Sequence, residues 1–194
     1  MDVVVGVDIG QKRDPTAICV AELDWRGPEL HFIIRFLERL PSGASYPEIT
    51  QRLSNVFFGV ERRTSQWPRI YVDATGVGKP VVDLLQEGCP DGEIIPVYFT
   101  HGDRRFEENG EIRLGKAFLV SRLQALLQTG RVHLPRTTES EVLFEELMNY
   151  EIRVSANAND TFGAFKVGTH DDQVTALGLA VQKDIPFDNG QWVW

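Results

Sequence analysis

The first hydrophobic stretch of the chain is a short run of β-branched residues. Four of the five residues at 3–7 are valine, and branched side chains suit a pleated strand while losing rotamer freedom in a helix. Because the run is apolar at successive rather than alternate positions, we expect a strand buried on both faces. Asp8 follows the run and therefore stands at the end of a central strand. A charge there is costly unless a cation neutralises it.

The rest of the hydrophobic pattern predicts further strands and then strands alternating with helices. Turn residues separate apolar runs at 16–21 and 30–36, which with the first strand form a predicted antiparallel meander. Apolar residues at helical spacing follow two capping boxes, Ser45-x-x-Glu48 and Thr138-x-x-Glu141. The other expected elements are strands at 69–73 and 93–98, helices from 80, over 113–129 and from 169 to 181, and a hairpin near 151–167. A polar, glycine-containing stretch at 100–110 has no expected element.

This order of elements predicts an α/β fold. Tight hairpins join antiparallel strands and long crossovers join parallel ones. The sheet should therefore be mixed, with three antiparallel strands plus parallel strands, and flanked by helices. Functional sites in such sheets form beyond the carboxyl ends of the strands, where neighbouring connections diverge. A chain of 194 residues suits one domain, with residues 187–194 as a tail.

Composition and charge narrow the class of protein. With 42% hydrophobic and 25% charged residues, the chain has the profile of a soluble globular protein and not of a disordered or membrane-spanning one. No signal peptide is evident, and two cysteines are too few for a disulfide framework, so we expect a cytoplasmic location. The net charge of −8 argues against a general nucleic-acid coat. It does not argue against an enzyme that acts on nucleic acid.

Four aspartates form the candidate site. Asp73 ends a strand as Asp8 does, and Asp171 and Asp172 lie at the start of the last expected helix. If the two strands are adjacent and parallel, their carboxylates lie side by side, and the helix start would add the other two. Such a cluster repels itself unless divalent cations relieve the repulsion, and Mg²⁺ or Mn²⁺ suits an all-carboxylate site. A pair of these ions can clamp the attacking and leaving oxygens in phosphodiester cleavage.

Three motifs resemble the C-terminal nuclease domain of the large terminase subunit of tailed bacteriophages, which has an RNase H-like fold. They are Val7-Asp8-Ile9-Gly10, Val72-Asp73-Ala74-Thr75-Gly76-Val77-Gly78 and the segment from His170 to Ala180. The resemblance spans about residues 3–183. It implies a metal-dependent endonuclease that cuts concatemeric double-stranded DNA with two Mg²⁺ or Mn²⁺ ions. Their ligands would be Asp8, Asp73 and Asp171, with Asp172 as a fourth.

The same resemblance implies cellular partners. The protein would be phage-encoded and located in the host cytoplasm, and its full-length form would act with the phage portal and the small terminase subunit. Members of this family carry an N-terminal packaging ATPase, which these 194 residues lack. The chain would then be either an excised nuclease domain or a protein whose motor is separate. No contact with a membrane is expected.

Several basic residues are weaker candidates for contacts with DNA. Arg104, Arg105, Lys116, Lys166 and His170 could bind phosphate oxygens, although such residues are more often simply solvated. The first three belong to a basic stripe that also includes Arg113, Arg122 and Arg131. The aspartates have simpler explanations as well, because each strand-end aspartate alone could cap a turn and Asp172 could close a cap begun by Thr169.

Three other functions remain open on the sequence. An actin-like or sugar-kinase-like ATP-binding domain also has Asp-x-Gly after a valine-rich strand, but it would leave the late Asp-Asp pair without a task. A Holliday-junction resolvase would use the same carboxylates on four-way junctions. An inactive DNA-binding or docking module would bind DNA without cutting it. The segment at 76–80 lacks the glycine and hydroxyl residues of a phosphate-binding P-loop, which favours a turn there.

Overall fold

The centre of the molecule is a mixed eight-stranded sheet. The structure, a computed structural model, describes residues 2–10, 14–76, 78–89, 91–154, 160–163 and 170–183. The strands are β1 (Val3–Asp8), β2 (Ala17–Arg26), β3 (Glu29–Arg39), β4 (Arg69–Asp73), β5 (Glu93–Thr100), β6 (Arg105–Glu108), β7 (Glu111–Gly115) and β8 (Val132–His133). They are arranged in the order β6-β7-β5-β4-β1-β2-β3-β8.

The topology confirms the predicted fold class. β1, β2 and β3 pair antiparallel in sequence, whereas β4 pairs parallel to β1 and β5 parallel to β4. β1 therefore has an antiparallel neighbour on one side and a parallel neighbour on the other. The predicted site needed the strands that carry Asp8 and Asp73 to be adjacent and parallel, and β1 and β4 meet this condition.

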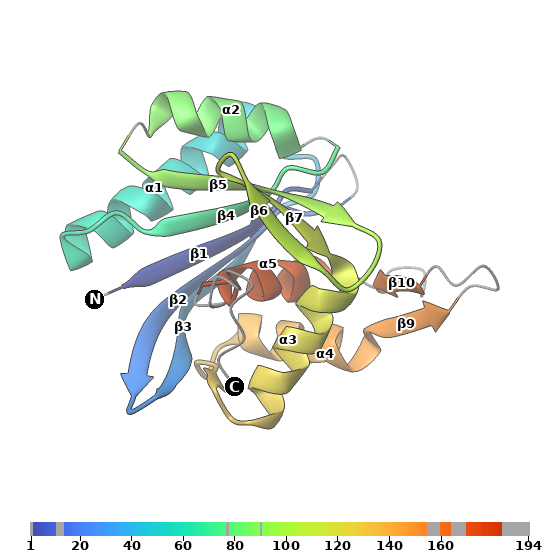
Figure 1. The fold of residues 1–194 in the computed structure, drawn as a ribbon. Coiled ribbons are helices and arrows are strands. Elements are labelled where there is room, and N and C mark those ends of the chain that lie inside the picture. The colour runs from blue at the N-terminus through green and yellow to red at the C-terminus, as the bar shows by residue number, and fades with distance from the viewer. Residues whose placement is uncertain are drawn as a thin grey trace.

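Helices cover both faces of this sheet. They are α1 (Tyr46–Thr64), α2 (Gly78–Gly88), α3 (Lys116–Gln128), α4 (Thr138–Asn149) and α5 (Asp172–Ala180). Figure 1 shows α1 and α2 on one face and α3, α4 and α5 on the other. Each face has its own hydrophobic core, in which β1 contributes Val5 and Val7 to the α1–α2 side and Val4 to the α5 side. No helix among the described residues is long and apolar enough to cross a membrane.

Three strands lie where the hydrophobic pattern predicted none. β6 and β7 form an antiparallel pair within and just after the polar stretch at 100–110, and β7 adds to the sheet parallel to β5. As a result α3 begins at Lys116 and not at about residue 113, since Arg113 belongs to β7. β8 is two residues long and pairs with β3. β6 and β8 are short strands at the two edges of the sheet, where pairing with a neighbouring backbone matters more than a hydrophobic pattern. β7 lies between β6 and β5, and its five residues alternate too briefly to separate a strand from the start of the helix expected from about residue 113.

The other helix starts after α1 also differ from the sequence prediction. α2 begins at Gly78, two residues before the predicted start at 80. α4 is capped by Thr137, whose hydroxyl accepts from the backbone N–H of Ser140, one residue before the predicted box at Thr138. α5 begins at Asp172 with Asp171 as the N-cap residue, and Thr169 lies outside the described residues. The first capping box is present as predicted, with Ser45 and Glu48 bonded to each other at the start of α1.

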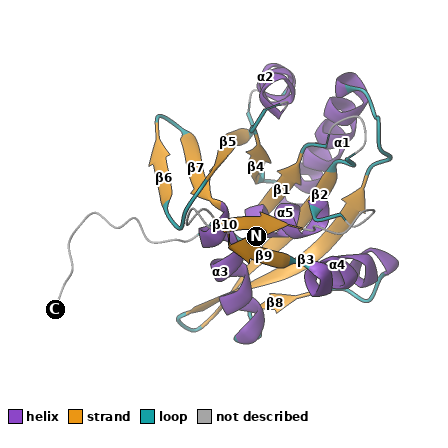
Figure 2. Cartoon of the chain, turned by 90° about the vertical axis from the view of Figure 1, so that its right-hand side faces the viewer, coloured by secondary structure: helices purple, strands orange, loops and turns teal. Residues whose placement is uncertain are grey.

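The two strands of the predicted hairpin near 151–167 are present. β9 (Glu151–Val154) pairs antiparallel with β10 (Asp160–Gly163) as a separate two-stranded sheet. Figure 1 shows this ribbon to the right of the main sheet, and Figure 2 views it from that side, in front of the sheet. The rest of the predicted hairpin, residues 155–159 and 164–167, lies outside the described residues, as does the expected tail at 187–194.

Candidate metal centre

Asp8 is on the face of β1 that carries α5. Side chains alternate along a strand, and because Val5 and Val7 enter the α1–α2 core, Gly6 and Asp8 face the opposite way. Gly6 is in direct contact with the backbone of α5, at Ala176 and Ala180. This close approach brings the first turn of the helix to the end of the strand, where Asp8 stands.

Asp73 is oriented by the loop that follows β4. Its Oδ1 accepts the backbone N–H of Thr75 at 2.8 Å, a local turn that aspartate forms readily. The Thr75 hydroxyl oxygen in turn accepts the N–H of Phe99 from β5, also at 2.8 Å. The loop is therefore tied to the neighbouring strand, and this fixes the direction of the Asp73 side chain.

Asp8 and Asp73 are brought together by strand register. Gly6 pairs with Tyr71 and Val7 with Val72 in the parallel ladder, so the two aspartates follow side by side at the strand ends. Their carboxyl groups are within hydrogen-bonding reach of each other. Burial raises the pKa of Asp8 well above its ordinary value, and the nearby charges of Asp73, Asp172 and Asp171 raise it further. Burial likewise raises the pKa of Asp73, although its bonds to Thr75 oppose the effect.

The other two acids come from the start of α5. Asp172 is 6% exposed, and burial raises its pKa to about 6 against the opposing charges of Arg39 and His170. Its Oδ2 is 3.7 Å from Arg39 Nε and 3.5 Å from His170 Nδ1, but it accepts no hydrogen bond from the described residues. Asp171 is half-buried, and as the N-cap residue it makes no side-chain cap bond.

The chemistry of these side chains fits a hard divalent cation. All four are carboxylates, and oxygen ligands are what Mg²⁺ and Mn²⁺ prefer. Burial raises the pKa values of both Asp8 and Asp73, and the charges of the other three acids raise that of Asp8 further. A cation beside these carboxylates would offset both effects. Within the described ranges, no three His, Cys, Asp or Glu side chains already surround one point. The acids are thus neighbours and not a preassembled ligand set.

The basic candidates differ in their distance from the acids and in their contacts. Lys116, the first residue of α3, is close enough to lower the pKa values of both Asp8 and Asp73, and its Nζ is 5.4 Å from the centre of the Phe99 ring. His170 is next to Asp172, as described above. Arg104 is exposed, whereas Arg105 is paired with Glu107 at 3.0 Å. Lys166 lies outside the described residues.

Two members of the basic stripe have structural contacts. Arg122 donates to the carbonyl oxygens of Val181 at 2.6 Å and Lys183 at 2.9 Å, which secures the chain after α5. Arg131 donates to the carbonyl oxygen of Leu30 at 2.7 Å. The sequence analysis assigned Arg122 and Arg131 to a stripe that could contact phosphates. In the structure their guanidinium groups donate to backbone carbonyl oxygens of the protein itself.

Three residues near the acids were not identified from the sequence. Arg39 ends β3 and contacts both Asp172 and Glu146, and Glu146 is a buried acid of α4. Tyr150 follows α4; burial raises the pKa of its hydroxyl, and the charges of Asp171 and Asp8 add to this. The sequence offered one signal for these residues, a charged side chain on the apolar face of a predicted helix. That side chain is Glu146, which lies between Leu143 and Leu147.

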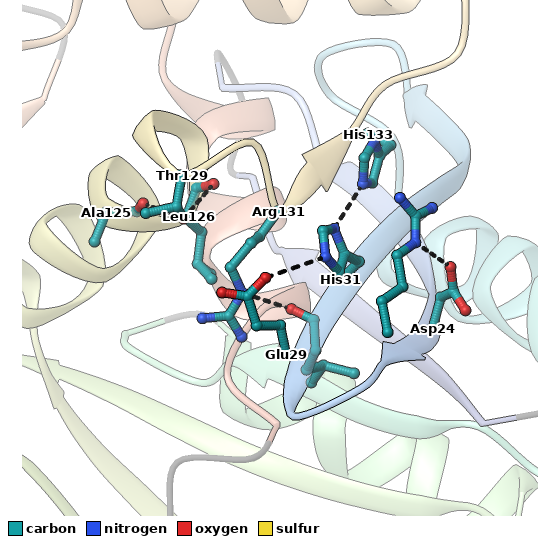
Figure 3. A network of polar contacts seen from close by, with 10 residues as sticks. Asp24, Glu29, His31, Ala125, Leu126, Thr129, Arg131 and His133 are labelled. Carbon is teal, nitrogen blue, oxygen red and sulfur yellow. Dashed lines mark hydrogen bonds and ion pairs between the residues drawn. The ribbon is translucent and has the colours of Figure 1, made fainter.

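A separate polar cluster lies at the other end of β3. Figure 3 shows His31 of β3 directed at His133 of β8, with Nδ1 of the first 2.9 Å from Nε2 of the second. Glu29 Oε2 is 3.9 Å from His31 Nε2. None of the four candidate aspartates belongs to this cluster, which is therefore separate from the metal centre.

The sequence profile of the terminase RNase H-like domain matches residues 5–184, which is most of the chain. The protein belongs to this family. The match includes all four aspartates, the whole of β4 and residues 5–8 of β1. No sequence among the curated proteins matches the chain.

Solved structures of terminase nucleases share the fold. The large terminase nuclease of the thermophilic phage G20c, with bound magnesium, is 24% identical with a TM-score of 0.66, covering 92% of this chain and 79% of that one. The manganese-soaked terminase nuclease domain of human cytomegalovirus is 16% identical with a TM-score of 0.56, covering 91% and 80%. The manganese-bound nuclease domain of the large terminase g2p of bacteriophage SPP1 is 14% identical with a TM-score of 0.55, covering 95% and 88%. At these identities the likeness establishes the fold.

Proposed function

We propose that this terminase domain is a divalent-metal-dependent endonuclease that cleaves concatemeric double-stranded DNA during phage genome packaging. The observation that carries the proposal is the convergence of Asp8 and Asp73 at adjacent parallel strand ends, with the start of α5 beside them. Family membership supports DNA as the substrate. The similar terminase nucleases of phage G20c, human cytomegalovirus and SPP1 were crystallised with magnesium or manganese, which supports the choice of metal.

Asp8, Asp73 and Asp171 would hold two Mg²⁺ or Mn²⁺ ions, with Asp172 as the fourth acid of the site. The bound ions supply Lewis acidity for phosphodiester hydrolysis. The residues of the chain hold and orient the site: Thr75 fixes Asp73, and Gly6 allows α5 to present its acids to Asp8. No protein side chain is then needed as a general base.

Lys116 is the best placed of the basic residues to bind the DNA backbone. Its charge acts on both Asp8 and Asp73, so a phosphate brought to these acids would also meet its ammonium group. The exposed Arg104 immediately precedes β6 and could extend the contact along the strand. In the full packaging machine, an ATPase, the portal and the small terminase subunit would present DNA to this site.

Plasmid nicking in Mn²⁺ tests the proposal. Asp8→Asn and Asp73→Asn should each lower the cleavage rate by at least about 100-fold, because several kcal/mol of transition-state stabilisation depend on the ions. Asp91→Asn, at an exposed turn residue, is the matched control and should cut like the wild type. Wild-type rates in both strand-end variants would refute the assignment.

The choice of substrate separates this function from a resolvase. We expect linear duplex to be cut at least as fast as a four-way junction of the same length. A strong preference for the junction would favour resolution over packaging. Nothing in the arrangement of the acids favours an actin-like ATP-binding domain, and the family match favours the terminase.

A further inference from the structure

The first turn of α5 is capped by a residue from another helix. The first backbone N–H groups of a helix have no partner within the helix, and an N-cap aspartate ordinarily accepts from the second or third of them. Asp171 is the N-cap residue of α5, but its carboxylate makes no such bond. Oε2 of Glu146 accepts these N–H groups instead, from Gln173 at 3.0 Å and from Val174 at 3.2 Å.

Glu146 is held in this position by Arg39. Its Oε1 contacts Arg39 Nη2, and the Glu146 side chain is 6% exposed while that of Arg39 is 25% exposed. A buried carboxylate is costly without a countercharge and hydrogen bonds, and here it has both the guanidinium and the positive end of the helix. Arg39 Nε also approaches Asp172 Oδ2 at 3.7 Å, so one guanidinium faces two acids.

We propose that Glu146 is a positioning residue: by capping α5 in place of Asp171, it leaves the Asp171 carboxylate available to the metal centre. This inference rests on the proposed function, since it assigns a task to the site described there. An aspartate at an N-cap can either bond to its own helix or bind a metal with the same oxygens, and Glu146 removes that competition. Arg39 is the second part of the arrangement, because it fixes Glu146 and faces Asp172.

Amide hydrogen exchange at Gln173 and Val174 tests the capping without any metal. Both amides should be protected in the wild type and in Asp171→Ala, because Glu146 caps them. They should stay protected in Glu146→Ala, since Asp171 is then free to turn back and cap its own helix. The double variant should lose protection. Loss of protection in Asp171→Ala alone, or in Glu146→Ala alone, would overturn the proposal.

Mn²⁺ affinity measured by calorimetry tests the consequence. Glu146→Ala should weaken binding by about 10–100-fold, the usual effect of removing a group that orients metal ligands, and it should also lower the thermal midpoint because Arg39 loses its partner carboxylate. Glu146→Gln keeps an oxygen that can accept both N–H groups and should restore most of the affinity. Glu145→Ala, an exposed neighbour on the same helix, is the matched control and should bind like the wild type.

The outcomes separate this inference from the proposed function. If the wild type binds Mn²⁺ and cuts DNA but Glu146→Ala has unchanged affinity, the positioning role is refuted and the nuclease remains. If the wild type neither binds Mn²⁺ nor cuts DNA, the proposed function fails, and the exchange experiment still decides which residue caps α5. Glu146→Gln distinguishes a positioning role from a purely structural one. If this variant has a much lower thermal midpoint and a proportionately lower Mn²⁺ affinity, the role of Glu146 is structural and the positioning role is refuted.

Discussion

A Cβ atom placed on Gly6 of β1 would lie 2.1 Å from the carbonyl oxygen of Ala176 in α5. Two backbones approach each other this closely only where a side chain is absent. The first residues of α5 are about one helical turn before Ala176, so the same approach carries Asp171 and Asp172 to the end of β1. The glycine within the valine run is therefore a determinant of the site as well as of the packing.

Gly6→Ala should push α5 away from the sheet. We expect a loss of about 1–3 kcal/mol in the free energy of unfolding, as in other overpacked cores, together with weaker Mn²⁺-dependent cleavage because the two acids of α5 move. Urea unfolding and plasmid nicking measure the two effects. Gly59→Ala in α1 is the control: nothing lies within 4 Å of its added Cβ, so it should stabilise by up to about 1 kcal/mol. Equal stability of Gly6→Ala and wild type would contradict the close approach.

Asp8→Asn should stabilise the metal-free protein. Burial and three neighbouring acids raise the folded-state pKa of Asp8 well above 3.8, so its contribution to stability is present below the unfolded pKa and is lost as the pH rises through the folded one. At neutral pH the charge is therefore unfavourable, and removing it should raise the thermal midpoint. A variant that unfolds at a lower temperature than wild type without metal would contradict this.

The same substitution should abolish stabilisation by metal. Binding to the folded state alone stabilises the wild type by about 2.7 kcal/mol when the ion is at 100 times its Kd. Asp8→Asn should show almost none of this rise in thermal midpoint when Mn²⁺ is added, whereas Asp91→Asn should show all of it. A full rise in Asp8→Asn would mean that the ion binds elsewhere.

The histidine pair should make stability depend on pH. Burial, Arg26 and His31 lower the folded-state pKa of His133, and Asp24 opposes them. For a base with a lowered pKa, the contribution to stability is present above the unfolded value of about 6.5 and is lost as the pH falls from that value through the lower folded one. The thermal midpoint should therefore drop between about pH 7 and pH 5.5 less in His133→Gln than in wild type. His101→Gln, at an exposed residue, should behave like the wild type.

Much of the fold follows from local pattern. The valine run predicted a central strand because branched side chains suit a sheet buried on both faces, and β1 has that position. The hairpins and crossovers predicted the mixed pairing, which the ladders confirm. The strands β6, β7 and β8 were not predicted in this way. β6 and β8 are short edge strands that depend on pairing with a neighbouring backbone, and the five residues of β7 are too few for a clear period.

The sequence by itself determined which residues could form the acidic site: Asp8 and Asp73 follow apolar runs, and Asp171 and Asp172 precede a helical one. Each of these is a relation between near neighbours in the chain. Only the tertiary structure decided that Glu146, and not Asp171, caps α5, and that Arg39 faces Glu146 across 107 residues of sequence. Such contacts form when β3, α4 and α5 pack together. The spacing of hydrophobic residues along the chain predicts each element, but it does not predict which buried charges come into contact.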